Sequence, residues 1–312
     1  MTMLTTTQKK AAESILNLFE TSEVLGDYGK VTLIPGDRGH LSFGRSQTTL
    51  GSGNLFKLLQ RYCSNSGARF GARLSTYLPR FEETDLTLDH DLKLHNLLRA
   101  SADDPVMRDS QDSFFDEYFW QPAARAAERE GISCALGTAL VYDGHVHGSW
   151  KLIRDRTNAQ VGRVATAGEQ HWLKTYVDQR RTWLATNSRA DLRATVYRMD
   201  TFERLIEQGY WGLELPLVVR DKEISLATLN ATPPGCYDGP QPGSRPLALT
   251  SPMLRGLDVR LLQLGLSEQG VDIKTDGIYG QTCLKRIKEY QAAHNIPVTG
   301  VADAALVARL TG

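Results

Sequence analysis

The sequence has few of the features that mark a membrane protein, a secreted protein or a structural metal site. Its four cysteines are isolated, with no CxxC pair and no metal-ligand spacing. No apolar run approaches the roughly 18 to 20 residues that span a bilayer. The N-terminal stretch MTMLTTTQKKAAES lacks the basic, apolar and small-residue segments of a signal peptide. We therefore expect reduced thiols, no membrane insertion and synthesis in the cytoplasm.

The sequence also lacks any excess of charge. It has 36 basic and 36 acidic residues, so no overall field attracts nucleic acid, and the polar composition favours a monomer. No phosphate-binding loop or dinucleotide fingerprint is present, so we expect no cofactor. His145 and His147 form an HxH pair without a third ligand of clear spacing, which is too weak a pattern to predict a metal.

Proline is scarce except in one stretch. Six of the twelve prolines lie in residues 231–252, together with three glycines. Proline has a fixed φ and no amide donor, so this density excludes helix and predicts an extended linker. It divides the 312 residues into a large domain (residues 1–230), the linker (231–252) and a small domain (253–312).

Apolar spacing predicts that the large domain is mainly helical. Positions 12, 15, 16 and 19 follow the i, i+3, i+4, i+7 pattern of an amphipathic helix. Residues 134–143, 171–184 and 191–208 predict further helices. Strand signals are confined to KVTLI and HLSFG, which flank the turn PGDRG as a hairpin. The aromatic run around Phe115, Tyr118 and Phe119 has helical spacing, which favours core packing over sugar stacking.

Two carboxylates in the segment FETSEVLGDYGKVTLIPGDRGHLSFGR are candidates for acid–base catalysis. Glu20 ends an apolar helix, where the helix dipole and desolvation both favour the protonated form that a general acid needs. Asp37 lies in a polar Gly-rich turn that favours the ionised form. Such a pair is typical of glycosidic bond cleavage. Equally, a helix end and a hairpin tip explain both residues, and Glu23 is a rival acid on chemistry alone.

The order of several motifs resembles a known enzyme family. The pattern LTTTQKKAAESILNLFETSE…YG…GDRGHLSFGR…TTLGSGNLFKLL resembles the N-terminal catalytic region of family 46 chitosanases and their relatives in the lysozyme superfamily. Further similarity occurs at QDSFFDEYFWQPA, ALVYDGHVHGS and YVDQRRTWL, so the resemblance covers roughly residues 4–217. It implies a bilobal lysozyme-like fold that is mainly α with a small β-hairpin or sheet.

The resemblance assigns roles to matching positions. It implies that Glu20 is the general acid, Asp37 the general base, and Ser42 the hydroxyl residue, usually Thr in the family, that holds the attacking water. The implied mechanism is inverting, with the carboxylates about 6.5–9.5 Å apart. It also implies that Gly39 and His40 lie in the substrate site.

A buried polar network is expected behind the acid. Asp143 and Arg180 each lie on or beside the apolar stripe of a predicted helix, so pairing would satisfy both, although each could also extend to solvent. Arg45 is a further supporting residue. Asn54 stands where the chitosanases carry an Asp that is thought to contact a glucosamine ammonium. A neutral amide favours an N-acetylated glycan such as peptidoglycan.

The small domain is expected to be a three-helix unit. Its motifs VRLLQ, DGIYGQTC, IKEYQ and IPVTGVAD resemble the peptidoglycan-binding domain of cell-wall hydrolases. The resemblance implies a binding surface near the DG-Y-G turn. On that basis its candidate residues are Asp276, Gly277, Tyr279 and Gln291, although the first two equally make the turn and Tyr279 equally packs in the core.

The sequence therefore favours a muramidase that cleaves the β-1,4 bond between N-acetylmuramic acid and N-acetylglucosamine. Two alternatives stay open, namely a chitosanase and a non-catalytic wall-binding protein. Without a signal peptide, we expect the chain to reach peptidoglycan in the periplasm or cell wall as a phage endolysin released through a holin, or as a toxin delivered by a secretion apparatus. A toxin implies an immunity protein as a partner.

Overall fold

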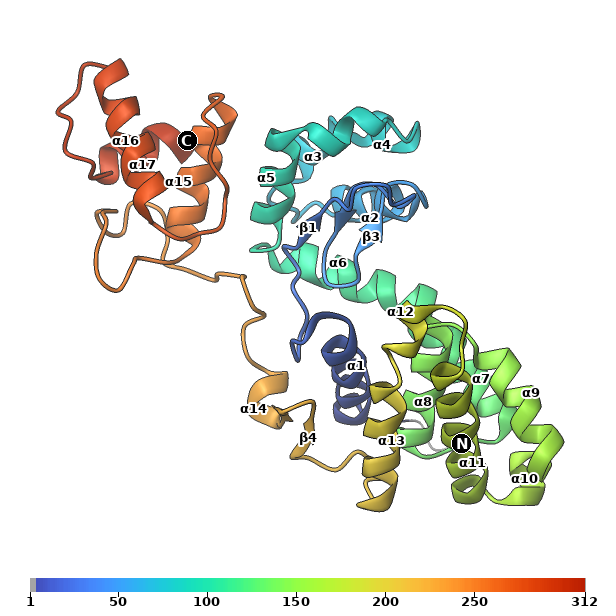
Figure 1. Ribbon diagram of the computed structural model, residues 1–312. Helices are drawn as coiled ribbons and strands as arrows, with labels where there is room; N and C mark the ends of the chain where they lie inside the picture. Colours follow the sequence, from blue (N-terminus) through green and yellow to red (C-terminus); the bar gives the residue numbers. More distant parts are fainter. Residues whose placement is uncertain (1–3, 312) are drawn as a thin grey trace. The chain divides into compact units, whose positions relative to one another are not determined.

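The computed structural model describes residues 4–311, and the chain forms two compact units (Figure 1). The first unit combines the segment ending at Gly26 with Phe114–Ala231. The second combines Asp27–Ser113 with the segment that begins at Thr232. The fold is mainly helical with small sheets, as expected. No helix within the described residues is long and apolar enough to cross a membrane.

The first unit is a bundle of helices around α8. This helix is buried on nearly every side and packs against α1, α7 and α9. A two-stranded antiparallel sheet of β4 (Leu217–Val219) and β5 (Lys222–Ile224) also belongs to this unit. Its helices are α1 (Thr6–Thr21), the π-helical η2 (Asp116–Trp120), α7 (Gln121–Glu130), α8 (Ala135–Val146), α9 (Trp150–Val161), α10 (Val164–Ala167), α11 (Glu169–Ala185), α12 (Ala190–Arg193), α13 (Tyr197–Glu207) and α14 (Leu226–Leu229).

The predicted helices of this unit are confirmed, with one interruption. The segment 191–208 forms α12 and α13 rather than a single helix. Helix α1 begins with a capping box, in which the Thr5 hydroxyl accepts from the Gln8 amide and the Gln8 side chain accepts from the Thr5 amide. It ends at Thr21 because Ser22 takes a left-handed conformation. Glu20 therefore lies in the last turn of α1.

The second unit begins with a three-stranded antiparallel sheet in the order β1 (Val31–Thr32), β2 (Ser42–Phe43), β3 (Thr48–Thr49). The predicted hairpin is its first pair, with Val31 opposite Phe43 and Thr32 opposite Ser42. Helices follow the sheet: α2 (Asn54–Cys63), α3 (Gly71–Ser75), α4 (Leu78–Glu82), the 3-10 helix η1 (Leu86–His90), α5 (Leu92–Ser101) and α6 (Pro105–Phe115).

The C-terminal module is the predicted three-helix unit. It contains α15 (Leu257–Glu268), α16 (Gln281–Ala293) and α17 (Ala304–Thr311). Val259, Leu262, Ile287 and Tyr290 are buried in its apolar cluster, and Leu284 packs against them. Tyr279 and Leu306 complete the core.

The proline-rich segment contains no helix or strand and packs against the rest of the second unit. Cys236 is buried in a small apolar cluster with Tyr28 and Ala102. The Tyr237 amide donates to Asp103 Oδ1 over 2.8 Å. Leu247 pairs through its backbone with Ala302 of the module. Proline density predicted the extended backbone but carried no information about these contacts.

Candidate active site

Glu20 projects from the last turn of α1 and is held by an arginine of α13. Its Oε1 accepts a hydrogen bond from Arg198 Nη2 over 2.6 Å. The Glu20 side chain is 45% exposed, whereas that of Arg198 is 4% exposed. The carboxylate is thus open to solvent at one end and fixed at the other. This differs from the desolvated position that the sequence predicts.

Arg198 joins Glu20 to a buried ion-pair network. Its Nη1 donates to Asp143 Oδ1 over 2.8 Å, and Arg180 Nη1 donates to Asp143 Oδ2 over 2.5 Å. Asp143 comes from α8 and Arg180 from α11, and both side chains are fully buried. The predicted pairing of Asp143 with Arg180 is therefore observed. Asp143 is shared by two arginines, so the two cations balance its charge and that of Glu20.

The network fixes the charge states of its members. Burial disfavours the charge on Asp143, but Arg180 and Arg198 outweigh it and hold the pKa of this carboxyl below its usual value. Burial likewise opposes the charge on Arg198, while Asp143 and Glu20 raise its pKa further than burial lowers it. His147 Nδ1 lies 3.3 Å from Arg180 Nη2, and burial together with Arg198 lowers the His147 pKa to about 4. At neutral pH the imidazole is therefore uncharged and accepts from Arg180.

Neighbouring groups hold the end of α1 in position. The Arg198 guanidinium lies over the Phe19 ring, 5.3 Å from its centroid. The last turn of a helix leaves carbonyl oxygens without helical partners. Here Tyr197 Oη donates to the Phe19 carbonyl over 3.0 Å, and Arg220 Nη1 donates to the Leu18 carbonyl over 3.3 Å. These contacts hold the backbone that carries Glu20.

Arg198 is the main functional residue that the sequence analysis missed. Its signal was present, because Phe202 and Leu205 follow at i+4 and i+7 and place Arg198 on the buried stripe of its helix. His147 was considered only as a metal ligand, whereas it contacts Arg180. His145 instead stacks on Trp150. Within residues 4–311, no three His, Cys, Asp or Glu side chains are grouped as a metal site would need.

Asp37 lies in the exposed loop between β1 and β2 of the second unit. The loop is closed by backbone hydrogen bonds from the Asp37 amide to the Ile34 carbonyl and from the Gly51 amide to the Gly39 carbonyl. A Cβ on residue 39 would lie 2.8 Å from Asp37 Oδ2, so a larger residue than Gly39 would displace this carboxylate. Glycine therefore leaves space for the carboxylate of Asp37.

His40 and Ser42 continue the same loop into β2. Asp89 holds this part of the loop, because its Oδ1 accepts from the Leu41 amide and its Oδ2 lies 2.8 Å from His40 Nδ1. The buried Ser42 hydroxyl donates to the His40 carbonyl over 3.3 Å. No sequence pattern pointed to Asp89, which lies 49 residues from His40.

Arg45 supports the three-stranded sheet of the second unit. Its guanidinium donates to Tyr28 Oη over 3.1 Å and forms an ion pair with Asp112. Its amide donates to Gln111 Oε1 over 3.0 Å, and Gln111 in turn donates to the Tyr28 carbonyl. Arg45 is therefore a supporting residue, as expected, for the loop that carries Asp37.

Comparisons with known proteins identify the family to which this chain belongs. Residues 14–217 match the model of glycosyl hydrolase family 46. The chain belongs to this family. Residues 255–310 match the model of a family described as a peptidoglycan binding domain. The protein is thus a family 46 glycoside hydrolase with a C-terminal domain of the peptidoglycan-binding type.

Relatives of the family 46 region are named chitosanases. A chitosanase of Bacillus subtilis (strain 168) is 28% identical over 235 residues, which cover 69% of this chain and 83% of the relative. The native chitosanase of Bacillus subtilis MY002 is 25% identical with a TM-score of 0.57, covering 70% of this chain and 96% of that one. A family 46 chitosanase of Gynuella sunshinyii in complex with chitotetraose has a TM-score of 0.56 at 24% identity, covering 72% and 99%.

Asn54 is the first residue of α2 in this family 46 domain. Its backbone amide lies in the first turn, where helical acceptors are lacking, and it donates to Ser52 Oγ over 3.3 Å. The side chain is partly exposed. Asn54 can therefore contact a ligand as a neutral donor and acceptor, without the charge that an Asp would supply.

The four residues proposed for wall binding have structural roles in the module. Tyr279 is fully buried and donates to the Gly300 carbonyl, which differs from the exposed position that binding requires. Asp276 Oδ1 accepts from Gln263 and from the Ile278 amide, and Gly277 has a positive φ of 74°. Gln291 is 3% exposed and bonds to the loop at Thr299, Gly300 and Val301.

Proposed function

We propose that this protein hydrolyses β-1,4 bonds between glucosamine units in the manner of a chitosanase. The observation that carries the proposal is the Glu20 carboxylate, which is exposed and yet fixed by Arg198 within the part of the chain that matches family 46. The chitosanase names of the relatives support the glucosamine substrate. The sequence favoured a muramidase, and these relatives favour its stated alternative.

The proposed reaction is a single displacement with inversion. Glu20 donates its proton to the glycosidic oxygen as the bond from that oxygen to the anomeric carbon breaks. Asp37 accepts a proton from a water molecule, whose oxygen forms the new bond on the opposite face of the sugar, and Ser42 helps to hold that water. The proposal requires the two carboxyls to lie about 6.5–9.5 Å apart around the bound glycan.

The polar network has a clear part in this reaction. Arg198 donates to Glu20 Oε1, which leaves Oε2 to carry the transferred proton. The ion pair between Arg198 and Glu20 then stabilises the carboxylate that remains after transfer. Asp143 keeps Arg198 in place from the buried side. Arg198 is therefore a positioning residue, because it acts on the bond through Glu20.

A muramidase is the second candidate. It is favoured by the domain at residues 255–310, whose family is named for peptidoglycan binding, and by the neutral Asn54. The same two carboxyls would then cleave between N-acetylmuramic acid and N-acetylglucosamine. A wall substrate would also place the site of action outside the cytoplasm. We propose release through a holin or delivery by a secretion apparatus, and a cleaved precursor in the periplasm would contradict both routes.

Product analysis separates the two candidates. Purified protein is incubated with chitosan and, separately, with purified peptidoglycan, and the products are identified by mass spectrometry. Glucosamine oligomers from chitosan with intact peptidoglycan are expected. Muropeptides with a reducing muramic acid and no chitosan oligomers would refute the proposal in favour of the muramidase.

Substitutions test the catalytic roles on whichever substrate is cleaved. Glu20→Gln and Asp37→Asn should each lower kcat by about 10²–10⁴-fold, the usual contribution of a general acid or base. Glu23→Gln is the matched control, because Glu23 is an exposed carboxylate three residues away, and its activity should be unchanged. Full activity in Glu20→Gln would remove the acid assignment. No hydrolysis of either substrate by the parent would support a non-catalytic wall-binding protein.

A further inference from the structure

One face of the C-terminal module is covered by the rest of the second unit. The side chain of Asn96, from α5, donates to Ser267 Oγ over 2.8 Å and to the Ile273 carbonyl over 2.7 Å. Thr275 completes this contact, because its hydroxyl donates to the Asn96 carbonyl over 3.0 Å. Asn96, Ser267 and Thr275 are all buried. This face of the module is therefore not available to a ligand.

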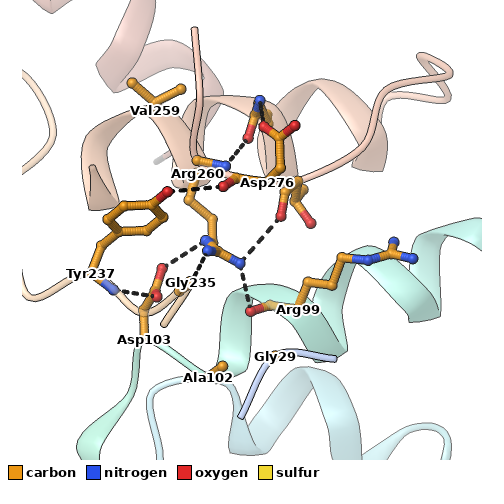
Figure 2. Close-up of polar contacts among 12 residues, drawn as sticks. Gly29, Arg99, Ala102, Asp103, Gly235, Tyr237, Val259, Arg260 and Asp276 are labelled. Atoms are coloured by element: carbon orange, nitrogen blue, oxygen red, sulfur yellow. Dashed lines mark hydrogen bonds and ion pairs between the residues drawn. The ribbon is translucent and has the colours of Figure 1, made fainter. Parts of the chain in front are cut away.

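The DG-Y-G turn lies against this covered face (Figure 2). Arg260 of α15 pairs with Asp103 over 2.9 Å and donates to the carbonyls of Arg99 and Thr275. Tyr237 Oη donates to the Asp276 carbonyl over 3.2 Å, as Figure 2 shows. A Cβ on Gly277 would lie 2.3 Å from the Tyr237 ring. The turn is thus packed against Tyr237, and a wall ligand has to bind elsewhere on the module.

The module has an open groove between α16, the loop at residues 296–303, and α17. The cavity is about 430 Å³, within the range of small-ligand sites, which is about 300–1,000 Å³. Gln291 bonds to the loop and sets one wall of the groove. Its lining combines apolar and polar side chains from Gln291, Ile296, Pro297, Thr299, Val301, Asp303, Ala305, Leu306 and Arg309.

Arg309 places a cationic side chain in this groove, whose lining also includes the carboxylate of Asp303. Its side chain is exposed, and it lies over the Tyr290 ring with Cζ 5.8 Å from the centroid. Within residues 4–311 it forms no ion pair with a carboxylate. Asp303 accepts from the Leu306 amide and caps α17. The guanidinium of Arg309 is therefore available to an anionic ligand.

We propose that this groove binds the peptide stems of peptidoglycan, with Arg309 pairing a stem carboxylate. Peptide stems carry free carboxylates beside alanine methyl groups, and the apolar floor at Ile296 and Leu306 fits those methyl groups. The proposal rests on the second candidate function, for which the C-terminal domain binds peptidoglycan. In this proposal the C-terminal module binds the peptide, and the family 46 domain binds the glycan.

The test is co-sedimentation of the full-length chain with purified sacculi. All variants also carry Glu20→Gln, so that the wall is not digested, and Glu20→Gln alone is the background for comparison. Arg309→Gln should raise Kd about tenfold, the usual loss of one charge-assisted hydrogen bond, and Arg309→Lys should recover part of it. Lys285→Gln, an equal change of charge on an exposed side chain of α16 outside the groove, should bind within twofold of the background.

Competition identifies the part of the wall that is bound. A soluble stem peptide should displace the chain from sacculi, whereas glycan strands stripped of their stems by an amidase should not. Unchanged binding by Arg309→Gln, or displacement by stem-free glycan alone, would overturn the proposal. Because this readout is binding, it is independent of the product analysis, so a failure here is distinguishable from a failure of the proposed hydrolysis.

Discussion

Replacing Arg260 by Met tests how strongly the C-terminal module is held within the second unit. Met keeps most of the apolar stem and removes the guanidinium. The side chain of Arg260 is 4% exposed and that of its partner Asp103 is fully buried. The substitution therefore leaves a buried carboxylate without its counter-charge. It also removes the donor that Arg260 supplies to the carbonyls of Arg99, Thr275 and Gly235.

The size of the effect follows from these contacts. Removing one partner of a buried ion pair typically costs about 3–5 kcal/mol. Asp103 limits the cost by taking up a proton, because burial raises the pKa of this carboxyl to about 6 in spite of Arg260 and the Tyr237 amide. We therefore expect a loss of about 3 kcal/mol in the free energy of unfolding. For a unit of this size that corresponds to a fall in Tm of roughly 6–12 °C.

The assay is thermal unfolding followed by circular dichroism, with limited proteolysis to locate the loosened segment. Cleavage of Arg260→Met is expected within residues 232–256, which releases the module. Arg73→Met is the matched control, because Arg73 joins the same face of the module through Glu268 but both side chains are more than 40% exposed. Such a pair contributes at most about 1 kcal/mol. A Tm for Arg260→Met equal to that of Arg73→Met would refute the reasoning.

Two further predictions concern the network behind Glu20. Arg198→Gln should lower kcat about 10–100-fold with little change in KM, because Glu20 loses its positioning contact. Steady-state kinetics measures both quantities. Arg198→Lys should recover part of kcat. The second concerns His147, which faces Arg180, Arg198, Asp143 and Glu20. Its pKa of about 4 in the folded state lies below the ordinary value of 6.5, so the unfolded state binds the proton first as pH falls. As the pH falls from about 6.5 to 4, the free energy of unfolding of the first unit should fall by roughly 2 kcal/mol. Urea titrations at several pH values measure this fall, which should be smaller in His147→Asn.

The sequence predicted those elements whose side chains repeat with a clear period. The helices α1, α8 and α11 carry continuous apolar stripes, and the buried positions of Asp143 and Arg180 on them were visible for the same reason. The division of residues 191–208 into α12 and α13 was not visible, because local propensity continues through the break. Arg198 was not singled out, although it lies on the buried stripe of its helix.

Contacts between distant segments carried no signal in the sequence. Arg260 and Asp103 are 157 positions apart, and either residue alone is typical of a solvated helix surface. The packing of the module depends on the burial of both side chains against each other. The spacing of residues along the sequence does not predict this burial. The DG-Y-G turn was placed correctly as a turn, but its assignment to binding failed because Gly277 packs against Tyr237 and Tyr279 fills the core.

The docking of the module changes what wall binding would do for catalysis. A module on a free linker raises only the local concentration of substrate. Here the segment before the module makes contacts at Cys236, Tyr237 and Leu247, and the module shares a compact unit with the loop that carries Asp37. A wall strand held in the groove beside Arg309 is then held at a set distance from Asp37. For the muramidase candidate, Arg260→Met should therefore keep its affinity for sacculi while losing the advantage of wall-bound over soluble substrate, which a simple tether would retain.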